Sequence, residues 1–236
     1  MDLSEKFIIT TRPIEKAIPA YSVLCLDVVN IPLTSLVPIP IDTGFVMGFN
    51  PEVCIFTSEY GANLYANLFG PAFKESIAVA IGQATASAIS GLFRNVMVPE
   101  EMTSTGVTDI LESKHLLHRR IALFTSEKSN MVIERFLMDR SARYCRMDLY
   151  RPVPIDHTII VDYIAREGFA GVLVTSSYEL DLLKETLKDR ISSIPVFVIG
   201  KTTLERAEEL KLSVREPIGK SNIKELLRSI AAQECK

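Results

Sequence analysis

Short apolar runs alternate along this chain with stretches whose apolar residues recur at helical spacing. The runs predict β-strands at residues 7–11, 23–29, 53–57, 77–81, 95–98, 121–125, 144–150, 171–175, 196–199 and 213–216. The helical stretches predict helices at residues 60–69, 83–93, 105–113, 129–139, 156–167, 177–188, 202–210 and 221–232. Strands that are apolar almost throughout and alternate with helices are typical of parallel sheets covered on both faces. An α/β fold is therefore expected.

Two proline-rich segments interrupt this alternation. Residues 31–40 read IPLTSLVPIP, and residues 150–154 read YRPVP. Proline removes a backbone donor, so such segments suit edge strands or linkers better than the middle of a sheet. If both segments are crossings, the chain forms two similar lobes, each a parallel sheet flanked by helices, joined by a two-stranded linker. The expected division is 1–35 plus 155–236 for the first lobe, 41–148 for the second, and 36–40 and 149–154 for the linker strands.

Composition and charge narrow the class of protein. The 236 residues are 47% hydrophobic and 23% charged, as in ordinary globular proteins. Lysine and arginine number 26 against 29 acidic residues, and no basic half or tail exists, which argues against a nucleic-acid partner. No apolar run approaches the roughly 20 residues that span a membrane, and the N-terminus lacks a long apolar signal region. We expect a cytoplasmic monomer with no membrane partner.

Cysteine and histidine usage gives no sign of a metal or cofactor site. The four cysteines are scattered without a CxxC pair: Cys25, Cys54, Cys145 and Cys235. Three of them lie in or beside apolar stretches, which predicts small core residues and not catalytic or disulfide-bonded ones, in keeping with the cytoplasm. His115 and His118 have no partner at zinc-ligand spacing. Neither GxxxxGK[ST] nor GxGxxG occurs, so we expect no nucleotide, metal or other cofactor.

The clearest signal is an internal repeat with an offset of 118 residues. CIFTSEYGANLY, from Cys54, matches VLVTSSYELDLL, from Val172. AVAIGQATASAIS, from Ala78, matches VFVIGKTTLERAE, from Val196. The matched pairs are Ser58 with Ser176, Gly82 with Gly200, and Thr85 with Thr203. The agreement in residue type, order and spacing predicts two lobes of common design.

Each repeat is a strand that ends in a hydroxyl or glycine and leads straight into a helix. The first turn of a helix has free N–H groups and a partial positive charge, and ligands of parallel sheets bind at the carboxyl ends of the strands. If the lobes face each other, these ends would form a cleft suited to carboxylates. The strand ends at residues 10–12 and 125–128 look similar. The alternative is that the hydroxyls only cap helices and the glycines only permit tight turns.

The motifs, taken in order, resemble those of the uroporphyrinogen-III synthase family. They are TRP from Thr11, FTS from Phe56, IGQATA from Ile81, LYRPVP from Leu149, TSS from Thr175 and IGKTT from Ile199. The resemblance runs from Ile8 to about Leu227. It implies a lyase of tetrapyrrole (heme) biosynthesis that closes hydroxymethylbilane into uroporphyrinogen III, with inversion of ring D and loss of water, and without metal or organic cofactor. From the residues alone, a non-catalytic two-lobed binder of a small anionic ligand remains the alternative.

The resemblance also implies roles for individual residues. Tyr150 stands at the family's tyrosine position and would donate a proton to the departing hydroxyl; the alternative is that its ring packs against the linker. Ser58, Ser176, Thr85 and Thr203 would bind substrate carboxylates. The remaining candidate substrate-binding residues are Arg12, Thr57, Gly82, Lys128, Arg151, Thr175, Gly200, Lys201 and Thr202. Lys201 and Leu204 depart from the family pattern, and Lys201 could contact a carboxylate or point into solvent.

Overall fold

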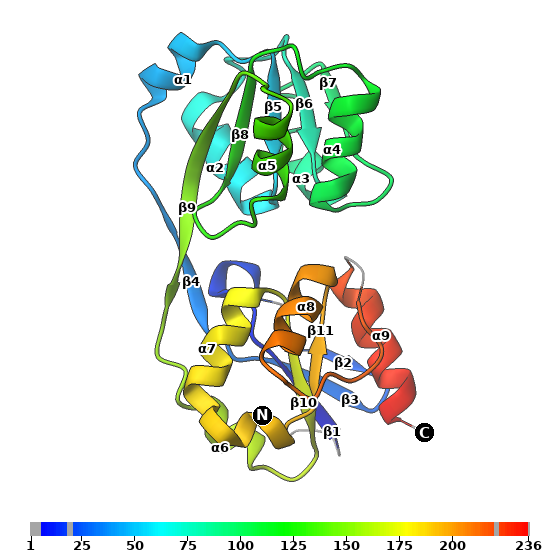
Figure 1. Cartoon of the computed structure of the whole chain (residues 1–236). Helices are drawn as coiled ribbons and strands as arrows, with labels where there is room; N and C mark the ends of the chain where they lie inside the picture. Colours follow the sequence, from blue (N-terminus) through cyan, green and yellow to red (C-terminus); the bar gives the residue numbers. More distant parts are fainter. Residues whose placement is uncertain (1–5, 18–20, 220–221, 236) are drawn as a thin grey trace. The chain divides into compact units, whose positions relative to one another are not determined.

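The computed structural model describes residues 6–17, 21–219 and 222–235, and the chain divides into two compact units (Figure 1). Unit 1 comprises Met1–Leu36 and Val153–Lys236, and unit 2 comprises Val37–Pro152. The chain leaves and re-enters unit 1 within β4 (Thr34–Pro38) and β9 (Tyr144–Pro154), which are neighbours in one sheet. The two proline-rich segments thus contribute to adjacent strands. The expected fold class is confirmed, because both units are mostly parallel sheets flanked by helices.

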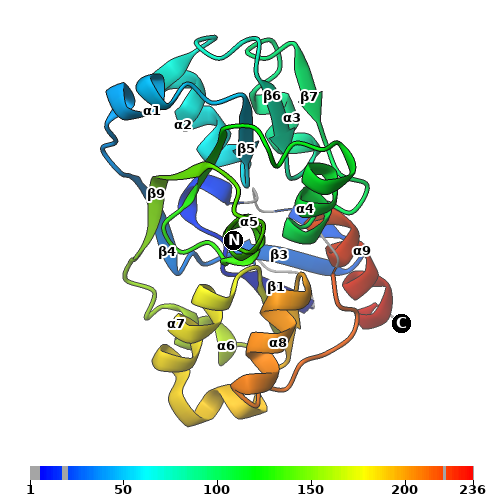
Figure 2. The same ribbon diagram turned by 45° about the horizontal axis from the view of Figure 1, so that its top comes forward.

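Unit 1 is built on a five-stranded sheet in the order β11-β10-β1-β3-β2, parallel except for β2 against β3. Alternate residues of β1 face opposite sides. Phe7 and Ile9 pack with the helices α6 to α8, whereas Ile8 packs with α9. The helices α6 to α8 and the helix α9 therefore lie on opposite faces of the sheet (Figures 1 and 2). The elements are β1 (Lys6–Thr10), η1 (Ile14–Lys16), β2 (Tyr21–Val23), β3 (Leu26–Asn30), α6 (Ile160–Ile164), β10 (Phe169–Val174), α7 (Ser177–Leu187), η2 (Lys188–Ser193), β11 (Val196–Val198), α8 (Lys201–Glu209) and α9 (Ile223–Glu234).

Unit 2 is built on a six-stranded sheet in the order β4-β9-β8-β5-β6-β7, and β5 to β9 pair in parallel. One face packs aliphatic side chains against α4 and α5. The other carries an aromatic cluster in which the ring of Tyr65 lies 4.9 Å from those of Phe56 and Phe124. The elements are α1 (Thr43–Phe49), β5 (Val53–Phe56), α2 (Glu59–Phe69), β6 (Ile77–Ala80), α3 (Gln83–Ala88), β7 (Asn95–Met97), α4 (Ser104–Ser113), β8 (Ile121–Ser126) and α5 (Val132–Asp139).

Two strand predictions were wrong. Residues 23–29 form no single strand but parts of β2 and β3, joined by a tight turn in which Leu24 has a φ of 57°. The apolar pattern is continuous across this turn, so it hid the reversal. Residues 213–216 form no strand; Val214 makes only an isolated bridge to Val196.

One helix was missed, and several predicted helices have different ends in the structure. Residues 43–49 form a helix that the pattern missed, although Asp42 caps it by accepting from the N–H of Phe45. The helices predicted at 83–93 and 156–167 shrink to α3 and α6. The cap of α4 is Thr103, and α9 is capped by Asn222, whereas the predicted start at Ser221 lies outside the described residues. No helix in the described ranges is long and apolar enough to cross a membrane.

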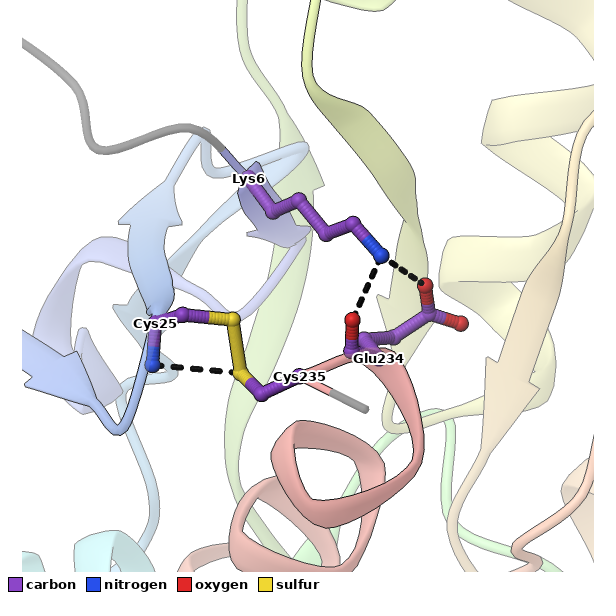
Figure 3. The surroundings of a disulfide bond; sticks show 4 residues. All are labelled: Lys6, Cys25, Glu234 and Cys235. Atoms are coloured by element: carbon purple, nitrogen blue, oxygen red, sulfur yellow. Dashed lines mark hydrogen bonds and ion pairs between the residues drawn. A yellow bond between two sulfur atoms is a disulfide. The ribbon is translucent and has the colours of Figure 1, made fainter.

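The cysteine prediction was right for unit 2 and wrong for unit 1. Cys54 and Cys145 are free and buried in the core. Cys25 and Cys235, separated by 210 residues, form a disulfide that ties the β2–β3 turn to the end of α9 (Figure 3). Beside it the Lys6 ammonium donates to the backbone carbonyl of Glu234 at 2.5 Å. The pairing depends on the unpredicted turn between β2 and β3, so the sequence pattern gave no sign of it.

Candidate functional site

The predicted repeat is a structural repeat. Each unit contains a strand, an 11-residue helix, a second strand and a second helix: β5-α2-β6-α3 in unit 2 and β10-α7-β11-α8 in unit 1. Ser58 and Ser176 cap α2 and α7 with nearly equal backbone angles, φ −161° and −150°. The C-cap residues of the two helices are Gly70 and Lys188, again 118 residues apart and both with φ 50°. The common design is confirmed, and both serines do act as caps.

In unit 2, the candidate Tyr150 lies directly on the capping serine. Its hydroxyl donates to Ser58 Oγ at 2.8 Å, and its ring makes a T-shaped contact with that of Tyr60, with centroids 4.9 Å apart. Tyr150 is buried. A Cβ at position 61 would lie 3.1 Å from Ser58 Oγ and 3.4 Å from Tyr150 Cε1, so Gly61 leaves the room that this arrangement needs. The tyrosine thus bonds the capping serine of α2 and packs its ring on the same helix.

The hydrogen bonds to Ser58 determine what this residue can offer a ligand. Its Oγ accepts from the Gly61 N–H at 3.0 Å as well as from Tyr150. A hydroxyl has two acceptor lone pairs and one donor hydrogen. Because both lone pairs are engaged, Ser58 presents its own O–H as a donor. The side chain stands at the positive end of α2 and is only partly buried, which suits an oxygen that carries negative charge.

In unit 1, a buried carboxyl occupies the corresponding place. Glu179 accepts from the Thr11 hydroxyl at 2.8 Å, from the Thr175 N–H at 3.1 Å and from the Thr175 hydroxyl at 3.2 Å. Burial raises the pKa of Glu179, and these donated hydrogen bonds oppose the rise. The carboxyl ends of β1 and β10 are thereby tied together by this chain's own side chain. Ser176 accepts from the Glu179 N–H at 3.2 Å.

The two glycine–threonine pairs occupy equivalent positions with different surroundings. Gly82 precedes α3 in an extended conformation, whereas Gly200 precedes α8 with a φ of 81°, which favours glycine. Thr85 and Thr203 are both buried. The sulfur of Met102 lies 3.3 Å from where a Cβ of Gly82 would stand, so this side chain covers the glycine.

The remaining candidates vary in exposure and engagement. The Thr57 and Thr125 hydroxyls are 2.7 Å apart at the ends of neighbouring strands β5 and β8. The backbone carbonyl of Arg12 accepts from the Asn30 amide at 3.2 Å. Lys201 is exposed and lies 3.7 Å from Glu205, while the carbonyl of the exposed Thr202 accepts from Ser177. Arg151 and Lys128 are also exposed.

Within each unit, some candidates meet and others do not. Ser58 contacts Tyr150 directly, and Thr175 and Ser176 meet at Glu179. Sequence reasoning missed Gly61 and Glu179. The Ser-x-x-Glu spacing of a capping box could have identified Glu179, whereas nothing in the sequence indicated that Gly61 leaves room for a tyrosine. A surface hollow beside α4, lined by residues 97–101 and one side of the helix, contains none of the candidates.

Taken together, these features define a two-unit α/β protein whose duplicated helices present capped, hydroxyl-bearing N-termini. The family model for uroporphyrinogen-III synthase HemD matches residues 22–227. The chain belongs to this family, and its function is that of a uroporphyrinogen-III synthase in tetrapyrrole biosynthesis. The family match gives no support to the alternative of a non-catalytic binding protein.

Solved structures support the fold. Uroporphyrinogen-III synthetase from Helicobacter pylori matches with a TM-score of 0.67 at 12% identity, covering 97% of this chain and 99% of that one. A mutant uroporphyrinogen III synthase from Thermus thermophilus matches with a TM-score of 0.62 at 15% identity, covering 98% of each chain. At these identities the likeness concerns the fold alone. No sequence among the curated proteins matches this chain.

Proposed function

We propose that this chain acts as a lyase on hydroxymethylbilane through Ser58 and Tyr150 of unit 2. The linear tetrapyrrole loses its terminal hydroxyl as water and closes into uroporphyrinogen III with ring D inverted. This assignment is supported by the hydrogen bonds of Ser58. Its Oγ accepts from Tyr150 and from the Gly61 N–H, so that its own O–H remains to donate to a substrate.

The first step needs a proton at the departing hydroxyl. The pyrrole nitrogen pushes electrons toward the terminal carbon, the C–O bond breaks, and the oxygen takes the Ser58 proton as water leaves. Ser58 regains a proton from Tyr150 along the 2.8 Å bond. A phenol O–H can supply it as a general acid. The terminal carbon then bonds to the ring D carbon that already carries a methylene bridge, and the bond to that older bridge breaks. The freed bridge carbon bonds to the free α-carbon on the other side of ring D, and loss of the proton from that carbon returns the pair to its starting state.

The second task is to hold a flexible substrate so that the inverted ring closes at the correct carbon. Holding two reacting ends in place removes much of the entropy cost of the step. We assign the substrate's carboxylates to the N-termini of α2, α7 and α8 and to the cations Arg12, Lys128, Arg151 and Lys201. Thr57, Ser176, Thr202 and Thr203 supply hydroxyl or backbone donors, while Gly82, Thr85 and Gly200 shape the helix starts. Thr175 directs its N–H and hydroxyl to Glu179 and therefore holds this turn in place.

The proposal requires no metal, organic cofactor, nucleic acid or membrane, and it describes a monomer in the cytoplasm. The Cys25–Cys235 disulfide removes one ground for that location, because disulfides are rare in reducing compartments outside thermophiles.

The test is to incubate the purified chain with freshly generated hydroxymethylbilane and to separate the uroporphyrinogen isomers. The expected product is the type III isomer, formed in proportion to enzyme concentration. Heat-denatured chain serves as the control and should give only the type I isomer that forms spontaneously. Type I as the only product of the folded chain would overturn the proposed function.

A further inference from the structure

Arg146 of β9 is enclosed by the loop that connects β8 to α5. Its Nη2 donates to the backbone carbonyls of Ser126 at 3.0 Å and Glu127 at 3.2 Å, and to Ser129 Oγ at 3.4 Å. Nη1 contacts the sulfur of Met131 at 3.3 Å. One guanidinium thus holds much of residues 126–131, which follow the carboxyl end of β8.

Two acids fix the guanidinium from the other side. Arg146 pairs with the buried Glu134 of α5, and its Nε lies 2.7 Å from Asp148 of its own strand. Burial lowers the pKa of Arg146, but the hydrogen bonds and charges of Asp148 and Glu134 outweigh that effect and raise it. A planar fork with five N–H donors can serve several partners at once, which an ammonium cannot do with the same geometry.

The loop that Arg146 holds is itself bonded to Tyr150. The Glu127 N–H donates to the Tyr150 carbonyl at 2.9 Å. Opposite this point the register of β8 and β9 shifts between Thr125 and Ser126, so that Ser126 stands beside Tyr150. A bulge of this kind redirects side chains. The path from Arg146 through the loop to the tyrosine therefore consists of two successive sets of hydrogen bonds.

We propose that Arg146 is a positioning residue for the reaction: by fixing the β8–α5 loop, it sets the backbone of Tyr150 and hence the direction of the phenol toward Ser58. The inference rests on the proposed function and deepens it. Neutralising Glu134 would require only a positive charge. The bonds to the carbonyls of Ser126 and Glu127 instead require the fork, so Arg146→Lys separates the two roles.

The test measures kcat and KM for Arg146→Lys with Tyr150 present and with Tyr150→Phe. We expect Arg146→Lys to lower kcat about tenfold with Tyr150 present and less than twofold further in the Tyr150→Phe background, since residues that act through one another are not additive. KM should change less than twofold in both. An equal fold-loss of kcat in the two backgrounds would overturn the proposal, as would full activity of Arg146→Lys.

A second readout does not depend on turnover. Amide hydrogen exchange at Glu127 reports the bond to the Tyr150 carbonyl, and Arg146→Lys should speed it about tenfold or more while the core of β5 keeps its protection. Unchanged exchange at Glu127 would overturn the inference. Failure of the wild-type chain to form the type III isomer would instead overturn the proposed function. Arg146→Met, which also removes the charge, should lower the melting temperature more than Arg146→Lys does.

Discussion

The helices α2 and α7 are equivalent in position, length and capping, yet different side chains surround their capping serines. In unit 2, the capping Ser58 accepts a hydrogen bond from Tyr150 of β9 and from the Gly61 N–H, so its own O–H can donate. In unit 1, the side chain that reaches the capping turn is Glu179, which draws hydrogen bonds from Thr11 and Thr175. One end is arranged as a donor, and the other is occupied by a carboxyl.

This difference shows which features of the two units the sequence repeat specifies and which it does not. The caps, the helix lengths and the helix ends recur at one offset, so the repeat carries the scaffold. Two groups distinguish the two helix N-termini. The first is Tyr150, which lies outside the repeated segments. The second is the third residue after the capping serine, which is Gly61 in unit 2 and Glu179 in unit 1. A glycine admits the tyrosine, whereas a glutamate fills the same turn with its own carboxyl.

The largest expected effect is on stability, and it compares the disulfide-bonded cysteines of unit 1 with the free cysteines of unit 2. Cys25→Ser removes the disulfide of unit 1 and should lower the free energy of unfolding by about 2–5 kcal/mol. Reductant should destabilise the wild type equally and leave Cys25→Ser unchanged in a denaturant titration. Cys54→Ala is the matched control in unit 2 and should remain sensitive to reductant. Equal stability of oxidised and reduced wild type would contradict this assignment.

The second prediction compares the two capping serines. Ser58→Ala and Ser176→Ala each lose a cap and should cost about 1 kcal/mol of stability. Only Ser58→Ala also loses the proposed proton donor, so its kcat should fall roughly 10²-fold, against a few-fold for Ser176→Ala. Steady-state kinetics with melting curves on the same preparations check both. Equal losses of kcat would mean that the two ends do not differ in the way described.

The third prediction isolates the phenol hydroxyl. Tyr150→Phe removes the hydrogen bond to Ser58 and keeps the ring, so the loss of stability should stay at about 1 kcal/mol. The kcat should fall about tenfold, because Ser58 then lacks the group proposed to reprotonate it. Tyr60→Phe, which keeps the ring packed against Tyr150, is the control and should retain most activity. An unchanged kcat in Tyr150→Phe would remove Tyr150 from the reaction.

The smallest effect is a dependence of stability on pH in unit 1. Burial raises the pKa of Glu179 above its ordinary 4.5, so the folded protein holds this proton more tightly than the unfolded chain. The contribution of this proton to the free energy of unfolding is complete below the ordinary pKa. It is lost as the pH rises through the raised pKa of the folded state. Glu179→Gln should flatten that part of the profile in unfolding curves recorded across this range. Parallel profiles for the two proteins would contradict the assignment.

Much of the fold followed from the sequence because buried parallel strands leave long apolar runs. The repeat gave the equivalence of Ser58 with Ser176, which the structure confirms. Patterns fail where the chain reverses inside an apolar run, as at Leu24, and the disulfide of Cys25 was missed for that reason. The contact between Tyr150 and Ser58 spans 92 residues and depends on a glycine three positions beyond the serine, which no local pattern encodes.

A crystal structure of the chain with uroporphyrinogen III bound would test the central claim, that the N-terminus of α2 is where the chemistry occurs. We expect the product at the β5–α2 turn, with the methylene bridge that lost the hydroxyl in contact with Ser58 Oγ, within about 4.5 Å, and the Tyr150 hydroxyl still on Ser58. A product bound only at the N-termini of unit 1, with no atom in contact with Ser58, would contradict the account.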